Sequence, residues 1–158
     1  SGQTLVALKA NELAGSGLSF DEVIKQTEQF IHEMGTKFVL ESLETLRKNG
    51  RLSTVTATLA SALNIKPVMT SNGNGEIDKV TQARGMSKAI IKMADAIKAD
   101  AVDPQNHTLM IAHCNNRKRA EFVKEEILKR LSFKDVQITE TGGISSLYAA
   151  DGGIVVCY

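Results

Sequence analysis

Two kinds of hydrophobic spacing alternate along this chain, and that alternation restricts its fold more than any other feature. Short β-rich runs, such as residues 108–112 and 136–139, follow longer segments whose apolar residues recur every three or four positions. Elements of both kinds must bury their apolar sides against one another. We therefore expect an α/β fold: a single domain over residues 1–158, with a largely parallel sheet, flanking helices and one β-hairpin.

Local signals place the boundaries of these elements. The segment Ser19 to Glu22 has the form of a capping box and predicts the start of a helix that Gly35 ends. Two β-rich runs flank Asn72-Gly73-Asn74-Gly75, which is typical of a hairpin turn. We also expect helices over residues 6–14, 42–48, 54–63, 86–97 and 116–131, and strands over 37–40 and 154–158.

The charge balance argues against partners that are recruited by a global electric field. The chain has 19 Lys and Arg against 18 Asp and Glu, a net charge of +1, so a general affinity for nucleic acid is not expected. No apolar run approaches the ~20 residues of a membrane span, and the amino end lacks the profile of a signal peptide. We expect a cytoplasmic protein. For the two cysteines, Cys114 and Cys157, we expect reduced buried thiols, with a redox pair as the alternative.

Residues with recognisable chemistry are scarce. The three histidines, His32, His107 and His113, lack metal-ligand spacing, and no complete nucleotide-binding glycine motif occurs, so we expect no metal and no cofactor. His113 alone follows a predicted strand, where α/β folds place their ligands. A hydrogen-bonded structural imidazole is the commoner explanation of a histidine at such a position.

Two local patterns leave alternatives open. The charge-free helix of small residues predicted over 54–63 can form the wall of an apolar pocket or ordinary core. Arg117-Lys118-Arg119 puts three cations in the first turn of a predicted helix, where the helix dipole favours anions. Either an acidic partner relieves that arrangement or the three side chains are solvated.

Residues 46–67, LRKNGRLSTVTATLASALNIKP, resemble a segment of the DegV family. In that family the segment has leucine, two basic residues, Gly-Gly-Arg-Ile-Ser, a helix of small residues and then Leu-Asn-Ile-Lys-Pro. The stretches Gly75-Glu76-Ile77, Lys79-Val80 with Arg84-Gly85, and 142–158 are similar to the hairpin, the helix start and the terminal segment of the family. The resemblance covers the carboxyl-terminal half of a two-lobed protein. We therefore expect the amino-terminal lobe to be absent and the chain to be a fragment.

The resemblance implies a bacterial fatty-acid-binding protein of phospholipid synthesis. Such a protein buries one acyl chain and presents its carboxylate to a fatty-acid kinase, which makes the acyl phosphate, so no catalysis of its own is expected. The implied partners are a long-chain fatty acid, the kinase and the amino-terminal lobe.

The same resemblance implies a set of site residues. Ser1 is similar to the end of a Ser-Gly-Gln element, and Tyr148 stands where many members have a histidine that reaches the carboxylate. Arg51 and Arg84 match basic positions, of which Arg84 is the better candidate for contacting the partner kinase or a phosphate. The expected lipid-binding residues are therefore Ser1, Arg51, Ser145 and Tyr148 from the resemblance, Ile65 and Met69 as apolar wall material, and His113 from its place after a predicted strand.

The chain departs from the family in lacking its two amino-terminal Thr- and Ser-containing motifs, which hold the carboxylate. By itself it should therefore lack the main anion clamp. A phosphotransfer or kinase subunit, related in fold to dihydroxyacetone kinase, is the alternative, with His113 as the candidate nucleophile. A purely structural half of a larger protein is a third possibility.

Overall fold

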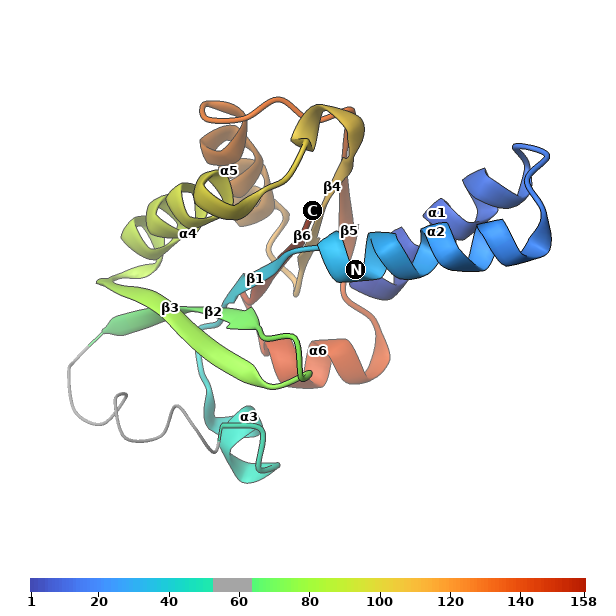
Figure 1. The fold of residues 1–158 in the computed structure, drawn as a ribbon. Helices are drawn as coiled ribbons and strands as arrows, with labels where there is room; N and C mark the ends of the chain where they lie inside the picture. The colour runs from blue at the N-terminus through green and yellow to red at the C-terminus, as the bar shows by residue number, and fades with distance from the viewer. Residues whose placement is uncertain (53–63) are drawn as a thin grey trace.

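A computed structural model describes residues 1–52 and 64–158. The helix predicted over residues 54–63 lies outside the described residues. The described strands form one six-stranded sheet in the order β3-β2-β1-β6-β4-β5 (Figure 1). Their bounds are β1 Thr36–Val39, β2 Ile65–Ser71, β3 Ile77–Arg84, β4 Thr108–His113, β5 Asp135–Glu140 and β6 Ile154–Cys157.

Helices lie on both sides of this sheet. In Figure 1, α4 and α5 lie on one side, α3 and α6 lie on the other, and the α1–α2 hairpin projects outward. No helix within 1–52 or 64–158 is both long enough and apolar enough to cross a membrane. The helices are α1 Gly2–Ala14, α2 Phe20–Glu33, α3 Glu44–Lys48, α4 Met86–Asp100, α5 Arg117–Leu128 and α6 Gly143–Ala149, with a short 3-10 helix at Pro104–Asn106.

The α/β class, the flanking helices and the hairpin are confirmed, but the expectation of a largely parallel sheet needs correction. The sheet is mixed: among the described strands only β4 and β5 pair in parallel. The last strand, β6, enters the centre of the sheet antiparallel to both β1 and β4. Alternating periodicity identifies strands and helices, but it does not fix the direction in which a strand enters the sheet.

One face of the sheet is completely filled by α4 and α5. Side chains on a strand alternate between faces, and Val39, Ile111 and Val156 on this face are wholly buried against Ile90 and Ile127 of the two helices. Lys37 also lies on this face. Its Nζ is 2.6 Å from Asp100 Oδ2 and 3.0 Å from the Tyr158 hydroxyl. Burial, together with a hydrogen bond to Asp100, raises the pKa of the Tyr158 phenol above its ordinary value.

The opposite face is covered only at its ends. Leu5 of α1 packs against Met110 at one end. Ala149 of α6 belongs to the cluster that buries Met69 at the other. The centre of this face therefore has no described helix packed directly over it, and it carries the hollow described below.

The capping of α2 is as predicted, but its apolar stripe is only partly buried. The Ser19 side chain accepts a hydrogen bond from the Glu22 backbone N–H. Phe30 packs inward, whereas Ile31, the next apolar residue of α2, is 46% exposed. The reason is that α2 packs mainly against α1, and a single neighbouring helix covers only part of the apolar side of α2.

A cluster of charges joins the end of β1, the start of β2 and the first turn of α5. Glu41, just after β1, accepts hydrogen bonds from Lys66 (2.6 Å) and Arg119 (2.7 Å). Arg119 also donates to the carbonyl of Gly152, just before β6. Partial burial disfavours the charged form of Glu41, but the hydrogen bonds from the two cations outweigh it and hold its pKa below the ordinary 4.5. We call Glu41, Lys66 and Arg119 the charge clamp.

The first prediction concerns Gly153, which is needed for close packing. A Cβ at this position would overlap the carbonyl oxygen of Ala149, a backbone atom that cannot move aside easily. Gly153→Ala should lower the free energy of unfolding of the full-length protein by roughly 2–3 kcal/mol. Chemical denaturation measures this. Gly73→Ala is the matched control, because nothing lies within 4 Å of its Cβ position. Equal stability of the two variants would contradict the assigned packing.

The second prediction follows from the lowered pKa of Glu41. Stabilisation from such a carboxylate is present above pH 4.5 and is lost as the pH falls through the folded-state pKa. Glu41→Gln should therefore melt at a lower temperature than the wild type at neutral pH, and the gap should shrink below pH 4.5. Glu121→Gln is the control, because its ion pair with Arg117 is more exposed. A gap that widened in acid would overturn the role of Glu41.

Candidate functional site

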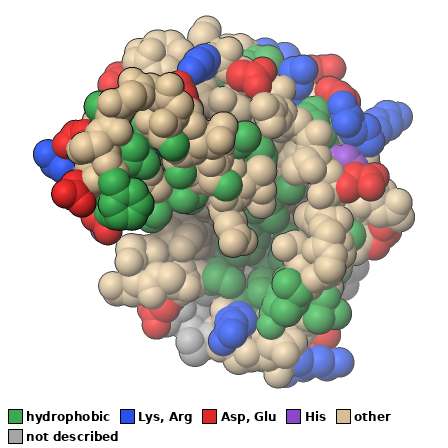
Figure 2. All heavy atoms as spheres, turned by 90° about the vertical axis from the view of Figure 1, so that its right-hand side faces the viewer, with side chains coloured by type: hydrophobic (Ala, Val, Ile, Leu, Met, Phe, Trp, Pro, Cys, Tyr) green, Lys and Arg blue, Asp and Glu red, His purple; other side chains and the backbone are tan. Residues whose placement is uncertain are grey.

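The partly covered face of the sheet forms an open hollow of about 520 Å³, here called the sheet-face hollow. Its floor is apolar and includes Phe38 and Leu40 of the β1 segment, Ala112 of β4 and Val155 of β6. Figure 2 faces the side of the molecule on which the α1–α2 hairpin projects, and it shows hydrophobic side chains inside a recess. A volume of this size lies in the range of small-molecule sites.

Strand periodicity puts this floor together. Thr36, Phe38 and Leu40 alternate with Lys37 and Val39, so the first three point into the hollow and the other two point toward α4. The walls come from the first turn of α1 and from α6, which follows β5. The floor is thus built from the sheet, whereas the walls are built from segments far apart in sequence.

A second hollow of about 550 Å³ adjoins the first and is here called the Arg51 hollow. The two hollows share Leu46 and Tyr148 as lining residues, so they meet at this pair. Residues 75–77 of the hairpin complete the Arg51 hollow. Arg51 is exposed and, among the described residues, forms no salt bridge, so its guanidinium is available to an anion.

Hydroxyl groups line the sheet-face hollow beside its apolar floor. Thr141 is one of them, and its hydroxyl is joined by a hydrogen bond of 2.8 Å to Ser146 of α6, which does not itself line the hollow. Ser1 Oγ and Thr36 Oγ1 lie 3.3 and 3.6 Å from the buried thiol of Cys157. The two adjoining hollows therefore combine an apolar floor and several hydroxyls with the exposed guanidinium of Arg51, which suits an elongated amphiphile with an anionic head. The Glu140 carboxylate also lines the sheet-face hollow, at the β5 side.

The structure brings four of the predicted site residues together. Ser1, Ser145 and Tyr148 line the sheet-face hollow. Arg51 lines the adjoining hollow, which Tyr148 also lines. Met69 is close by but wholly buried, packed with Leu40, Leu46, Leu52 and Ala149 beneath the hollow.

The other three predicted residues lie elsewhere. Ile65 lines a separate hollow of about 410 Å³ with Leu52. Arg84 ends β3 at the sheet edge and is exposed. His113 is only 1% exposed and lies on the filled face, with its Nδ1 accepting a hydrogen bond from the Asn116 N–H (3.3 Å) and its Nε2 unpaired. A buried, hydrogen-bonded imidazole of this kind fits a structural role for His113.

Several lining residues could not be recognised from the sequence. Phe38 and Leu46 are single apolar residues in short elements, with no motif to mark them. Thr139 lies in β5 and Thr141 directly follows that strand, and the only signal in the sequence is a pair of threonines at the end of a predicted strand.

The three cations at the start of α5 are largely satisfied within the chain. Arg119 belongs to the charge clamp, and Arg117 pairs with Glu121 at 2.9 Å. Both cysteines are free thiols. Within 1–52 and 64–158, no group of three or more His, Cys, Asp or Glu side chains is placed to hold a metal ion.

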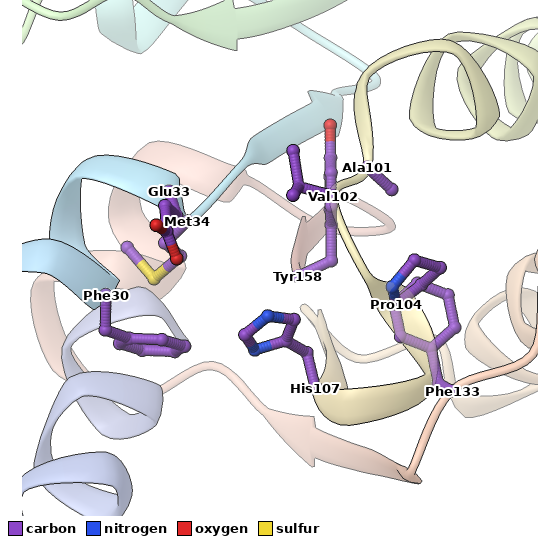
Figure 3. Close-up of a pocket in the computed structure, with 9 residues that line it drawn as sticks. All are labelled: Phe30, Glu33, Met34, Ala101, Val102, Pro104, His107, Phe133 and Tyr158. Atoms are coloured by element: carbon purple, nitrogen blue, oxygen red, sulfur yellow. The ribbon is translucent and has the colours of Figure 1, made fainter.

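A further cavity lies between the end of α2 and the Pro104 loop, as Figure 3 shows. Phe30 and His107 face each other across it, with ring centroids 5.8 Å apart. Its volume is about 10 Å³, enough for one water molecule. It is therefore too small to hold the ligand that the two large hollows suit.

The chain matches known proteins over nearly its full length. A family model described as "Uncharacterised protein, DegV family" matches residues 1–158. A DegV domain-containing protein of Streptococcus pyogenes is 32% identical over 154 residues, which cover 98% of this chain and 54% of that protein.

Two solved structures are similar in sequence and fold. A DegV family protein from Ruminococcus gnavus, refined with vaccenic acid, is 47% identical with a TM-score of 0.95, covering 98% of this chain and 55% of that one. The Streptococcus pneumoniae Fatty Acid Kinase (Fak) B3 protein, loaded with linoleic acid, is 30% identical with a TM-score of 0.87. The match covers 98% of this chain and 54% of that one, so the chain spans about half the length of these relatives.

Proposed function

The chain belongs to the DegV family, and on that premise we propose that it is the part of a fatty-acid-binding protein that encloses the acyl chain. Its partner in this proposal is the remaining half of the same protein, which would supply the hydroxyls that hold most of the carboxylate. The single observation that carries the proposal is the sheet-face hollow, whose apolar floor is continuous with an end that carries Arg51.

Energetics assign different tasks to the floor and to the polar groups. Each methylene removed from water contributes about 0.8 kcal/mol, so a long acyl chain gains on the order of 10 kcal/mol. A hydrogen bond to a charged group contributes about 1.5–3 kcal/mol. The apolar floor would therefore supply most of the affinity, and the polar groups would fix the direction of the ligand.

Arg51 and Tyr148 support a head group at the end of the site where the two hollows meet. The guanidinium can bind a carboxylate with two parallel hydrogen bonds. The Tyr148 phenol can donate one more, but without the charge that a protonated histidine would add. Ser1 and Ser145 would then contact the ligand along the sheet-face hollow, while Met69 supports its floor from beneath.

We further propose that the whole protein presents the carboxylate to a fatty-acid kinase and catalyses no reaction itself. The similarity to the Fak B3 protein supports this role. The alternative of a phosphotransfer subunit gains no support from the site, because His113, its candidate nucleophile, is 1% exposed. A phosphoryl donor would have to reach an imidazole that is enclosed by core residues.

The third prediction tests the apolar floor. Lipid extracted from the purified full-length protein should contain a long-chain fatty acid, identified by mass spectrometry. Phe38→Ala should weaken binding of that acid about tenfold to a hundredfold, because it removes one large apolar side chain from the floor. Phe20→Ala, the same substitution on a residue 77% exposed on α2, should leave binding unchanged.

Two results would refute the carrier role. One is a full-length protein that neither retains nor binds fatty acid. The other is a Phe38→Ala variant with native circular dichroism and unaltered affinity, because the floor would then not contact the ligand. A phosphohistidine found in the protein would instead favour the phosphotransfer alternative.

The fourth prediction concerns the kinase. Arg84 is exposed at the edge strand β3, away from both hollows, so it is placed to contact a partner rather than the lipid. In the full-length protein, Arg84→Ala should leave fatty-acid binding nearly intact and lower acyl phosphate formation roughly tenfold. Arg117→Ala, another exposed arginine, is the control. Unchanged phosphorylation would remove Arg84 from the proposed partner surface.

A further inference from the structure

The tip of the β2–β3 hairpin contains two successive Asn-Gly pairs, Asn72-Gly73 and Asn74-Gly75. An asparagine before glycine is prone to react with its own backbone, since glycine has no side chain to hinder approach of the next amide nitrogen. No heavy atom lies within 4 Å of the Cβ position of either glycine. Sequence and steric freedom therefore do not distinguish the two pairs.

Hydrogen bonding does distinguish them, because the Asn72 side chain is held in place. Its Oδ1 accepts from the backbone N–H groups of Asn74 (3.0 Å) and Glu76 (2.9 Å). Its Nδ2 donates to Asp78 (3.2 Å) and more weakly to Glu76 (3.4 Å). Attack by the Gly73 nitrogen on the Asn72 amide carbon would require this set of contacts to break.

Asn74 has no such restraint. It is exposed, and within the described residues its side chain forms no hydrogen bond. The nitrogen that would attack it, that of Gly75, donates one hydrogen bond to the Asn72 carbonyl at 3.1 Å. Only this one contact has to open, and it lies at the exposed tip of the turn.

We propose that Asn74 is a self-modification site of the folded protein. The Gly75 nitrogen attacks Asn74 Cγ, the new N–C bond closes a succinimide ring, and the bond from Cγ to Nδ2 breaks. The Gly75 amide loses its proton, which joins Asn74 Nδ2, and Nδ2 leaves as ammonia. Water then opens the ring at either carbonyl and gives aspartate or isoaspartate. The only co-reactant is water, and no atom is oxidised or reduced.

The modification would change the rim of the Arg51 hollow. Gly75, Glu76 and Ile77 line this hollow together with Arg51. The product adds a carboxylate next to Glu76, and isoaspartate also inserts a methylene into the main chain of the turn. Added negative charge weakens the attraction of the rim for an anionic head group. This consequence rests on the proposed function, whereas the modification itself does not.

The test is to age the full-length protein at mildly alkaline pH and physiological temperature. Peptide mass spectrometry that separates aspartate from isoaspartate gives the rate at each asparagine. In the folded protein Asn74 should react at least about tenfold faster than Asn72, since fewer hydrogen bonds have to break. In urea the two rates should become similar, because both side chains are then free.

Two variants sharpen the comparison. Asn74→Gln should abolish the fast reaction. Asp78→Ala removes a contact of the Asn72 amide and should raise the rate at Asn72 alone. Equal rates in the folded protein, or an unreactive Asn74, would overturn the proposal. If Asn74 reacts but the affinity for fatty acid is unchanged, the modification site stands and its effect on the rim is refuted.

Discussion

The unequal covering of the two faces of the sheet is the constraint from which the rest of the structure follows. On one face α4 and α5 fill the space so completely that Val39, Ile111 and Val156 are excluded from solvent. On the other face α1 and α6 cover only the two ends. A half-covered apolar face is unfavourable in water unless something else packs on it. An acyl chain and the other half of a two-lobed protein are both suited to that face, and the proposed function uses both.

The charge clamp joins the end of β1 to the start of β2 and to α5. It includes Lys66, which belongs to the segment 46–67 that carries the family resemblance. The Lys66 ammonium donates to both the carboxylate and the backbone carbonyl of Glu41. In the described structure Lys66 therefore fixes the start of β2 against the end of β1. Pro67 pairs with Gln82 of β3 but lies in a part of β2 where no pairing with β1 occurs, so no hydrogen bond to β1 is lost at this position. Residues of a motif that identifies a family can thus stabilise the fold without lining the ligand site.

Much of the candidate site could be anticipated, but only where a local pattern was tied to a place in the fold. Ser1, Ser145 and Tyr148 lie in segments that resemble the family, and the structure places all three at one hollow, with Arg51 beside it. His113 is a candidate because it ends a predicted strand, yet the end of a strand does not determine which face a side chain occupies. One residue of register decides that, and here it puts His113 under α5. Phe38 and Leu46 had no local signal, because a pocket floor uses the same residue types as a core.

The sequence by itself determined the kind and order of the described elements other than α6 and the short 3-10 helix, together with the cap of α2, the hairpin turn and the family, because each is set by spacing or side-chain chemistry over a few neighbouring residues. Only the tertiary structure decided that β6 inserts between β1 and β4, that the sheet is mixed, and that its two faces are covered unequally. Those outcomes depend on contacts between residues far apart in the chain, such as Glu41 with Arg119 or Ser1 with Cys157. Their free energy is gained only when distant segments meet, so no local pattern along the chain records it.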